Sequence, residues 1–116
     1  MHEFSLMASV LQVAEQSARQ ANAQRITRIT LKIGALTEVL PDAMQFAHQA
    51  LTPGTLAEGS DLVLNQIEAR SRCLSCGLEY TPDRYRRYCP DCAALACELL
   101  AGRELEIESI EVENGD

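Results

Sequence analysis

The sequence has no long apolar run and no recognisable export signal. None of its 116 residues lies in a stretch approaching the roughly 20 consecutive apolar residues needed to cross a bilayer. The first residues lack a basic segment followed by an apolar core, so we expect no secretory signal. These absences predict a cytoplasmic protein with no membrane partner, in which cysteines serve as metal ligands or free thiols rather than disulfides.

Basic residues are also scarce. The chain has 10 Lys and Arg against 17 Asp and Glu, which gives a formal net charge of −7. A protein that follows a nucleic-acid duplex needs a basic face that displaces counterions from the phosphates. The balance therefore argues against a nucleic-acid partner. The sequence also offers no nucleophile–base constellation and no glycine loop of the phosphate-binding kind, so we predict that the protein is not an enzyme.

The apolar content of 47% is enough for one modest core. Apolar residues follow helical spacing in two segments and strand alternation in three others. The predicted helices cover 5–22, with Ser5 as N-cap, and 41–51, and the predicted strands cover 25–34, 61–69 and 103–113. We therefore expect an α/β (α+β) fold with a small three-stranded mixed sheet and two helices. This domain comprises residues 1–69 and 101–116, and a zinc-ribbon-like module at 70–100 is inserted into it.

Four cysteines follow the spacing C-x2-C-x12-C-x2-C, and they are Cys73, Cys76, Cys89 and Cys92. Each pair presents two thiolates from one tight turn, and the intervening loop can fold the pairs face to face. Four sulfurs can then close a tetrahedron around zinc at about 2.3 Å each, with no open position. The spacing therefore predicts a structural zinc site. The alternatives are an Fe–S cluster, two disulfides, or a thiol–disulfide exchange motif.

The remaining cysteine, Cys97, lies too far beyond the second pair to join it by spacing. We expect a buried small residue there, and the alternative is a reactive thiol.

Arginines gather in and beside the cysteine module. They can offset the negative charge of a four-thiolate site, and they are Arg70, Arg72, Arg84, Arg86 and Arg87. The stretch Tyr85-Arg86-Arg87-Tyr88 also has the basic and aromatic character of a single-strand binder. Because Glu79, Asp83 and Asp91 cancel this local charge, we interpret the stretch as a loop that shields and balances the zinc. The alternative is a zinc-ribbon adaptor that binds protein or nucleic acid.

The chain opens with Met1-His2-Glu3, which offers a primary amine, an ionisable backbone amide and an imidazole within two residues. Ni(II) and Cu(II) favour nitrogen fields of this kind. Glu3 could add an oxygen contact or orient the imidazole. Taken alone the motif is weak, because a histidine near a terminus is usually solvated.

Four segments together resemble the hydrogenase nickel-incorporation family of HypA/HybF type. They are MHEFSL at the start, LKIGAL, GTLAEGSDL, and the CxxCG…CPxC pair, and they occur in the family's order along the whole chain. The resemblance implies a metallochaperone that binds one nickel ion at its N-terminus and delivers it during [NiFe]-hydrogenase maturation. It further implies a GTPase of the same pathway and the hydrogenase large subunit as partners, and in some organisms a urease maturation factor.

Carried over by position, the resemblance implies nickel binding by Met1, His2 and Glu3. It assigns zinc to Cys73, Cys76, Cys89 and Cys92. Some relatives place histidines beside the zinc cysteines, whereas the other histidine here, His48, lies in the second predicted helix. We expect His48 to be a partly buried helix residue, and the alternative is a metal contact. We also expect an exposed, flexible nickel chelate, and short hinges around the zinc module that would permit a homodimer by exchange.

Overall fold

The computed structural model describes residues 2–82 and 87–114. The chain forms two compact units. One comprises residues 1–31, 39–65 and 106–116, and the other comprises residues 32–38 and 66–105. Within residues 2–82 and 87–114, the helices do not combine the length and the hydropathy of a membrane span.

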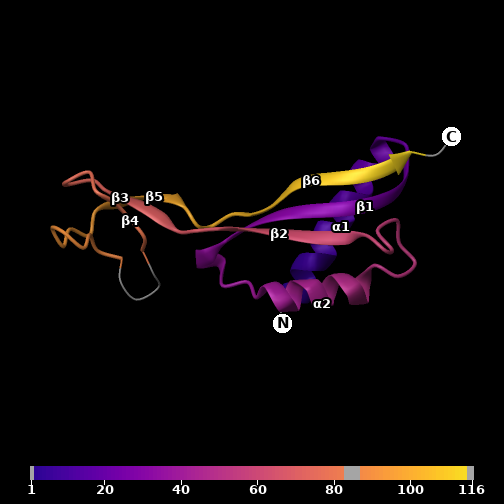
Figure 1. The fold of residues 1–116 in the computed structure, drawn as a ribbon, viewed down its shortest axis with the longest axis horizontal. Coiled ribbons are helices and arrows are strands. Elements are labelled where there is room, and N and C mark those ends of the chain that lie inside the picture. Colours follow the sequence, from indigo (N-terminus) through magenta and orange to yellow (C-terminus); the bar gives the residue numbers. More distant parts are fainter. Residues whose placement is uncertain (1, 83–86, 115–116) are drawn as a thin grey trace. The chain divides into compact units, whose positions relative to one another are not determined.

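The first unit contains two helices and most of a three-stranded sheet. Its elements are α1 (His2–Gln20), β1 (Ala23–Gly34), α2 (Pro41–Leu51), β2 (Asp61–Ile67) and β6 (Leu105–Asn114). The strand order is β2-β1-β6. Figure 1 shows β1 and β2 running in one direction, joined through α2, while β6 runs in the opposite direction. The predicted two helices and mixed three-stranded sheet are confirmed.

The two helices and β1 supply the fully buried apolar side chains of the first unit. The buried side chains of both helices recur at three- or four-residue spacing, which places them on one face of each helix. Strand β1, which is central in the sheet, contributes isoleucine and leucine side chains to the same core. The fully buried members are Met7, Ala14 and Ala18 of α1, Met44 and Ala47 of α2, and Ile26, Ile29 and Leu31 of β1.

The start of α1 differs from the prediction. The helix begins at His2, and Ser5 lies inside its first turn rather than at an N-cap. The Ser5 hydroxyl donates to the carbonyl of His2 at 3.0 Å, a bond within the helix. Helix α2 matches the predicted bounds, because Pro41 at its first turn and the Pro53-Gly54 stop are local signals. His2 therefore belongs to the first helical turn instead of preceding the helix.

The second unit is built on a smaller antiparallel sheet that sequence periodicity did not predict. Its elements are the 3-10 helix η1 (Ala35–Thr37) and the strands β3 (Arg70–Cys73), β4 (Glu79–Tyr80) and β5 (Cys97–Ala101), in the order β4-β3-β5. In β3, Ser71 pairs with Tyr80 on one side and Leu99 on the other. Two to five residues are too few to show a period, so periodicity gives no signal for these strands.

Two glycines bring distant backbone segments of the second unit together. The amide of Gly34 donates to the carbonyl of Glu104 at 2.7 Å, and the amide of Leu36 donates to the carbonyl of Gly102 at 2.8 Å. A Cβ on Gly34 would lie 2.1 Å from the Gly102 oxygen, and Gly102 has φ +125. Only glycine allows this approach and this backbone angle. The contact holds residues 32–38 against residues 102–104 within the second unit.

Candidate metal centres

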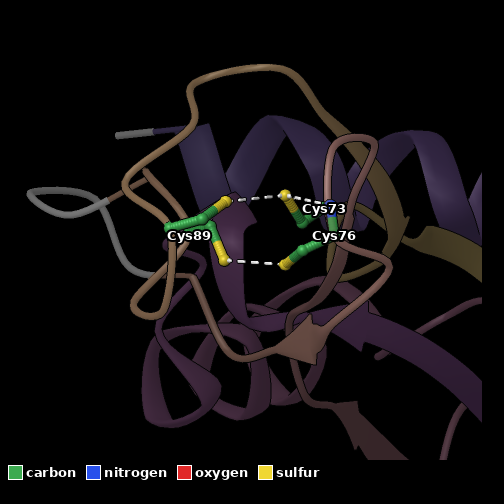
Figure 2. Close-up of side chains that lie close together, drawn as sticks. Cys73, Cys76 and Cys89 are labelled. Carbon is green, nitrogen blue, oxygen red and sulfur yellow. Dashed lines mark hydrogen bonds between the residues drawn. The ribbon is translucent and has the colours of Figure 1, made fainter.

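The four predicted zinc ligands meet at one point. The sulfur atoms of Cys73, Cys76, Cys89 and Cys92 all lie within 4.8 Å of one another, and they are the only such group found among the described residues. Two Sγ–Sγ distances are 3.5 Å, between Cys73 and Cys92, and 3.6 Å, between Cys76 and Cys89. Figure 2 shows the sulfurs of Cys73, Cys76 and Cys89 turned into the same space. These spacings fit a tetrahedron of four Zn–S bonds, whose edge is about 3.8 Å.

Two tight turns hold the sulfurs in place. After β3 the chain reverses so that the amide of Gly77, at φ +80, donates to the carbonyl of Cys73. The amides of Ser75 and Cys76 both point at the Cys73 sulfur at 3.4 Å. In the second turn Ala93, at φ +59, donates to the carbonyl of Cys89. Backbone amides aimed at sulfur favour the thiolate form, which is the form that binds metal.

The thiols perturb one another strongly. The hydrogen bond from the Cys76 amide is the main reason that the pKa of Cys73 falls to about 6. The Leu78 amide acts to lower the pKa of Cys76, but the neighbouring sulfurs of Cys89 and Cys73 outweigh it and raise that pKa to about 12. One thiolate therefore suppresses ionisation of its neighbours, and a cation is needed before all four can ionise together. The residues fit zinc, which takes four thiolates in a closed structural site.

The flanking arginines act less directly on this charge than predicted. Arg70 forms an ion pair with Glu79, and Arg72 forms one with Glu98, so these guanidinium groups already have carboxylate partners. Arg84, Tyr85 and Arg86 lie outside the described residues, so the predicted loop of Tyr85-Arg86-Arg87-Tyr88 is described only at Arg87 and Tyr88. Arg87 is described, and it lines a cavity of the second unit.

Of the predicted nickel ligands, Met1 lies outside the described residues. His2 is exposed at the first position of α1. Glu3 is buried, and one of its carboxylate oxygens accepts a hydrogen bond from the Leu40 amide at 3.2 Å. This bond is the main reason that the pKa of Glu3 is lowered, with the charge of His2 contributing. Glu3 thus ties the first turn of α1 to the start of α2.

A second contact reinforces this link. The rings of Phe4 and Phe46 pack edge to face, with centroids 5.9 Å apart and planes at 70°. Sequence reasoning missed both Leu40 and Phe46 as supports of the terminus. No local pattern could have found them, because each contact joins residues about forty positions apart.

His48 lies outside both candidate metal centres. It is buried on α2, and its Nε2 lies 2.8 Å from the Ser60 hydroxyl. Burial lowers the pKa of His48, and the charge of Asp61 only partly opposes this. The expected place of His48 in the second helix is confirmed, and the side chain is buried more completely than the partial burial expected. Among the described residues His48 joins no group of metal-ligand side chains.

Fold and site together define a small α+β protein with a four-cysteine metal site. Its sequence matches, over residues 1–112, the family described as hydrogenase/urease nickel incorporation, metallochaperone, HypA. It is 40% identical to the hydrogenase maturation factor HypA of Acidithiobacillus ferrooxidans, over 97% of this chain and 100% of that one. It is also 40% identical to HypA of Geobacter metallireducens, with the same coverage.

Solved structures agree on the fold. The Ni metallochaperone HypA from Helicobacter pylori superimposes with a TM-score of 0.69 at 20% identity, covering 99% of this chain and 100% of the other. A second solution structure of a HypA protein gives a TM-score of 0.66 at 22% identity, over 97% and 96% of the two chains. The chain belongs to the HypA family of hydrogenase maturation factors, as the sequence resemblance predicted. The description of this family is that of a metallochaperone.

Proposed function

We propose that this protein binds Ni(II) through its first residues, Met1, His2 and Glu3, and delivers the ion during [NiFe]-hydrogenase maturation. A structural zinc ion is held by the four-cysteine cluster defined above. The observation that carries the nickel assignment is the exposed position of His2 at the first residue of α1. Membership of the HypA family supports the same assignment.

The backbone at this position suits nickel. The first four amides of a helix have no acceptor within it, so the His2 amide can lose its proton and bind the ion without breaking a helical hydrogen bond. The exposed imidazole belongs to the same residue as this amide. When both nitrogens bind one ion they close a chelate ring, and Ni(II) prefers nitrogen ligands of this kind. Glu3 keeps acceptor capacity beyond its bond to Leu40, which leaves it able to contact the ion or the imidazole.

The contacts that anchor this turn affect its affinity for nickel. Because Glu3 and Phe4 fix the first turn to α2, the donors lose little freedom on binding nickel. The exposure of His2 leaves the ion open to a tighter acceptor. These two properties suit a carrier that receives nickel and passes it on without catalysing a reaction.

As partners we propose the maturation GTPase of the same pathway and the hydrogenase large subunit, with a urease maturation factor where urease is served. A homodimer is the alternative to a monomer. We place the protein in the cytoplasm, with neither nucleic acid nor membrane among its partners. The acidic net charge supports the exclusion of nucleic acid.

Nickel titration of untagged protein tests the chelate. We expect wild-type protein to bind one nickel ion, and His2→Ala or a variant with residues added before Met1 to lose that binding. The matched control is His48→Gln, which alters the other histidine and leaves the terminus intact. It should bind nickel as the wild type does. Equal nickel affinity in wild type, His2→Ala and the extended variant would rule out the terminal chelate.

The adaptor alternative makes the opposite prediction. It requires Arg86 and Arg87 for partner binding and gives His2 no role. A pull-down of the maturation GTPase with Arg86→Gln/Arg87→Gln and with His2→Ala separates the two functions, because a nickel carrier should retain the partner in the arginine variant and an adaptor should lose it.

A further inference from the structure

The cysteine outside the metal cluster stands opposite one of its ligands. Strands β3 and β5 are antiparallel, and their register places Cys73 directly across from Cys97. The Leu74 amide donates to the carbonyl of Ala96 at 3.0 Å, which makes that neighbouring pair a hydrogen-bonded one. Because the two kinds of pair alternate along antiparallel strands, Cys73 and Cys97 form a non-hydrogen-bonded pair.

This type of pair suits a disulfide. Directly opposite residues in it have Cα atoms about 4.5 Å apart and side chains on the same face. Disulfides join residues whose Cα atoms lie roughly 4.4–6.8 Å apart, so no backbone movement is required. The two side chains already pack in one cluster, in which Cys97 borders the buried Cys73 and Tyr80.

The Cys97 thiol is also reachable. It is half-buried, its sulfur lies 3.9 Å from the Arg87 carbonyl, and it lines a cavity of about 190 Å³. By the same measure a single water molecule needs about 10–15 Å³, so a small hydroperoxide fits. Arg87 and Arg103 line the same cavity, and their positive charge can stabilise the oxyanion that leaves when an O–O bond breaks.

We propose that Cys97 is an oxidation site for a small hydroperoxide, and that it passes the oxidation to Cys73 and thereby opens the zinc site. In the first step the Cys97 sulfur takes the terminal oxygen of the hydroperoxide and becomes a sulfenic acid. The O–O bond breaks, and the thiol proton leaves with the alcohol, or with water when the oxidant is hydrogen peroxide.

In the second step the Cys73 sulfur attacks the Cys97 sulfur. An S–S bond forms, the S–O bond breaks, and water leaves with one proton from solvent. Each sulfur loses one electron overall, and the hydroperoxide gains two. Zinc then retains three of its four thiolates, and a site with fewer ligands holds the ion less tightly. A thiol reductant reverses the change.

The experiment uses the full zinc-loaded chain and hydrogen peroxide. Zinc release is followed with a chromogenic chelator, and the disulfide is located by peptide mass mapping. We expect wild type to form a Cys73–Cys97 cross-link and release zinc, and a reductant to restore zinc binding. Cys97→Ser should keep its zinc at the same peroxide dose. Because Cys97 is not a ligand in the cluster, this variant should carry one zinc ion before treatment.

A matched control moves the thiol along the strand. In Cys97→Ser/Leu99→Cys the thiol lines the same cavity but stands opposite Ser71 instead of a zinc ligand. We expect this variant to keep its zinc and form no cross-link to Cys73. The proposal is overturned if Cys97→Ser or the double variant releases zinc as fast as wild type, or if the cross-links join only the four ligands. None of these readouts involves nickel, so the result is independent of the terminal chelate.

Discussion

Replacement of Gly34 by alanine should destabilise the second unit more than any open glycine would. The added Cβ would lie 2.1 Å from the Gly102 oxygen and 2.6 Å from the Arg103 nitrogen, and neither backbone atom can turn aside. The added methyl group overpacks the contact and forces the two backbone segments apart, which costs about 1–3 kcal/mol. It also weakens the Gly34–Glu104 and Leu36–Gly102 hydrogen bonds, each worth about 0.5–1.5 kcal/mol. We therefore expect a loss of about 2–6 kcal/mol in the free energy of unfolding.

The measurement is denaturant unfolding of zinc-loaded protein, with Gly59→Ala as the control. Gly59 has φ +76 but no atom within 4 Å of an added Cβ, so alanine there adds only backbone strain. That strain costs about 1–2 kcal/mol. Hydrogen exchange should place the extra loss of Gly34→Ala in residues 32–38 and 102–104. A Gly34→Ala protein no less stable than Gly59→Ala would refute the reasoning from close backbone approach.

Two predictions concern the pH dependence of stability, measured by urea unfolding. The pKa of Glu3 is lowered in the folded state, so its stabilisation is present above the unfolded value of 4.5 and is lost as pH falls through the folded pKa. Glu3→Gln should therefore be less stable than wild type at neutral pH, and the gap should close in acid; a gap that is constant with pH would contradict this. The pKa of His48 is also lowered, so folding disfavours its protonation, and wild type should lose stability as pH falls through the unfolded value of 6.5. His48→Gln should lack that loss, and equal pH profiles for the two proteins would count against a buried neutral imidazole.

Local signals in the sequence predicted the parts of the fold that depend on neighbours in the chain. Helix α2 begins at Pro41 and ends at Leu51 as predicted, because its proline start and apolar spacing lie within one segment. The cysteine cluster is equally local in origin, since two short turns carry all four thiols. Spacing alone was enough to predict that the sulfurs would converge.

The features that were missed depend on contacts between distant segments. Helix α1 extends back to His2, where Glu3 accepts a hydrogen bond from the Leu40 amide. Residues 32–38 join the cysteine-bearing unit through Gly34 and Gly102, almost seventy positions apart. The short strands β3, β4 and β5 pair only because the turns between them bring them together. One-dimensional periodicity carries no signal for any of these contacts.

The four zinc ligands are not equally sheltered. Each CxxC turn contributes one buried sulfur, from Cys73 or Cys89, and one exposed sulfur, from Cys76 or Cys92. A competing chelator arriving from solvent therefore reaches the exposed sulfurs of Cys76 and Cys92 first, while Cys73 and Cys89 still coordinate the ion. Ligand exchange with a chelator should begin at the exposed pair, and the two buried thiolates should dissociate last.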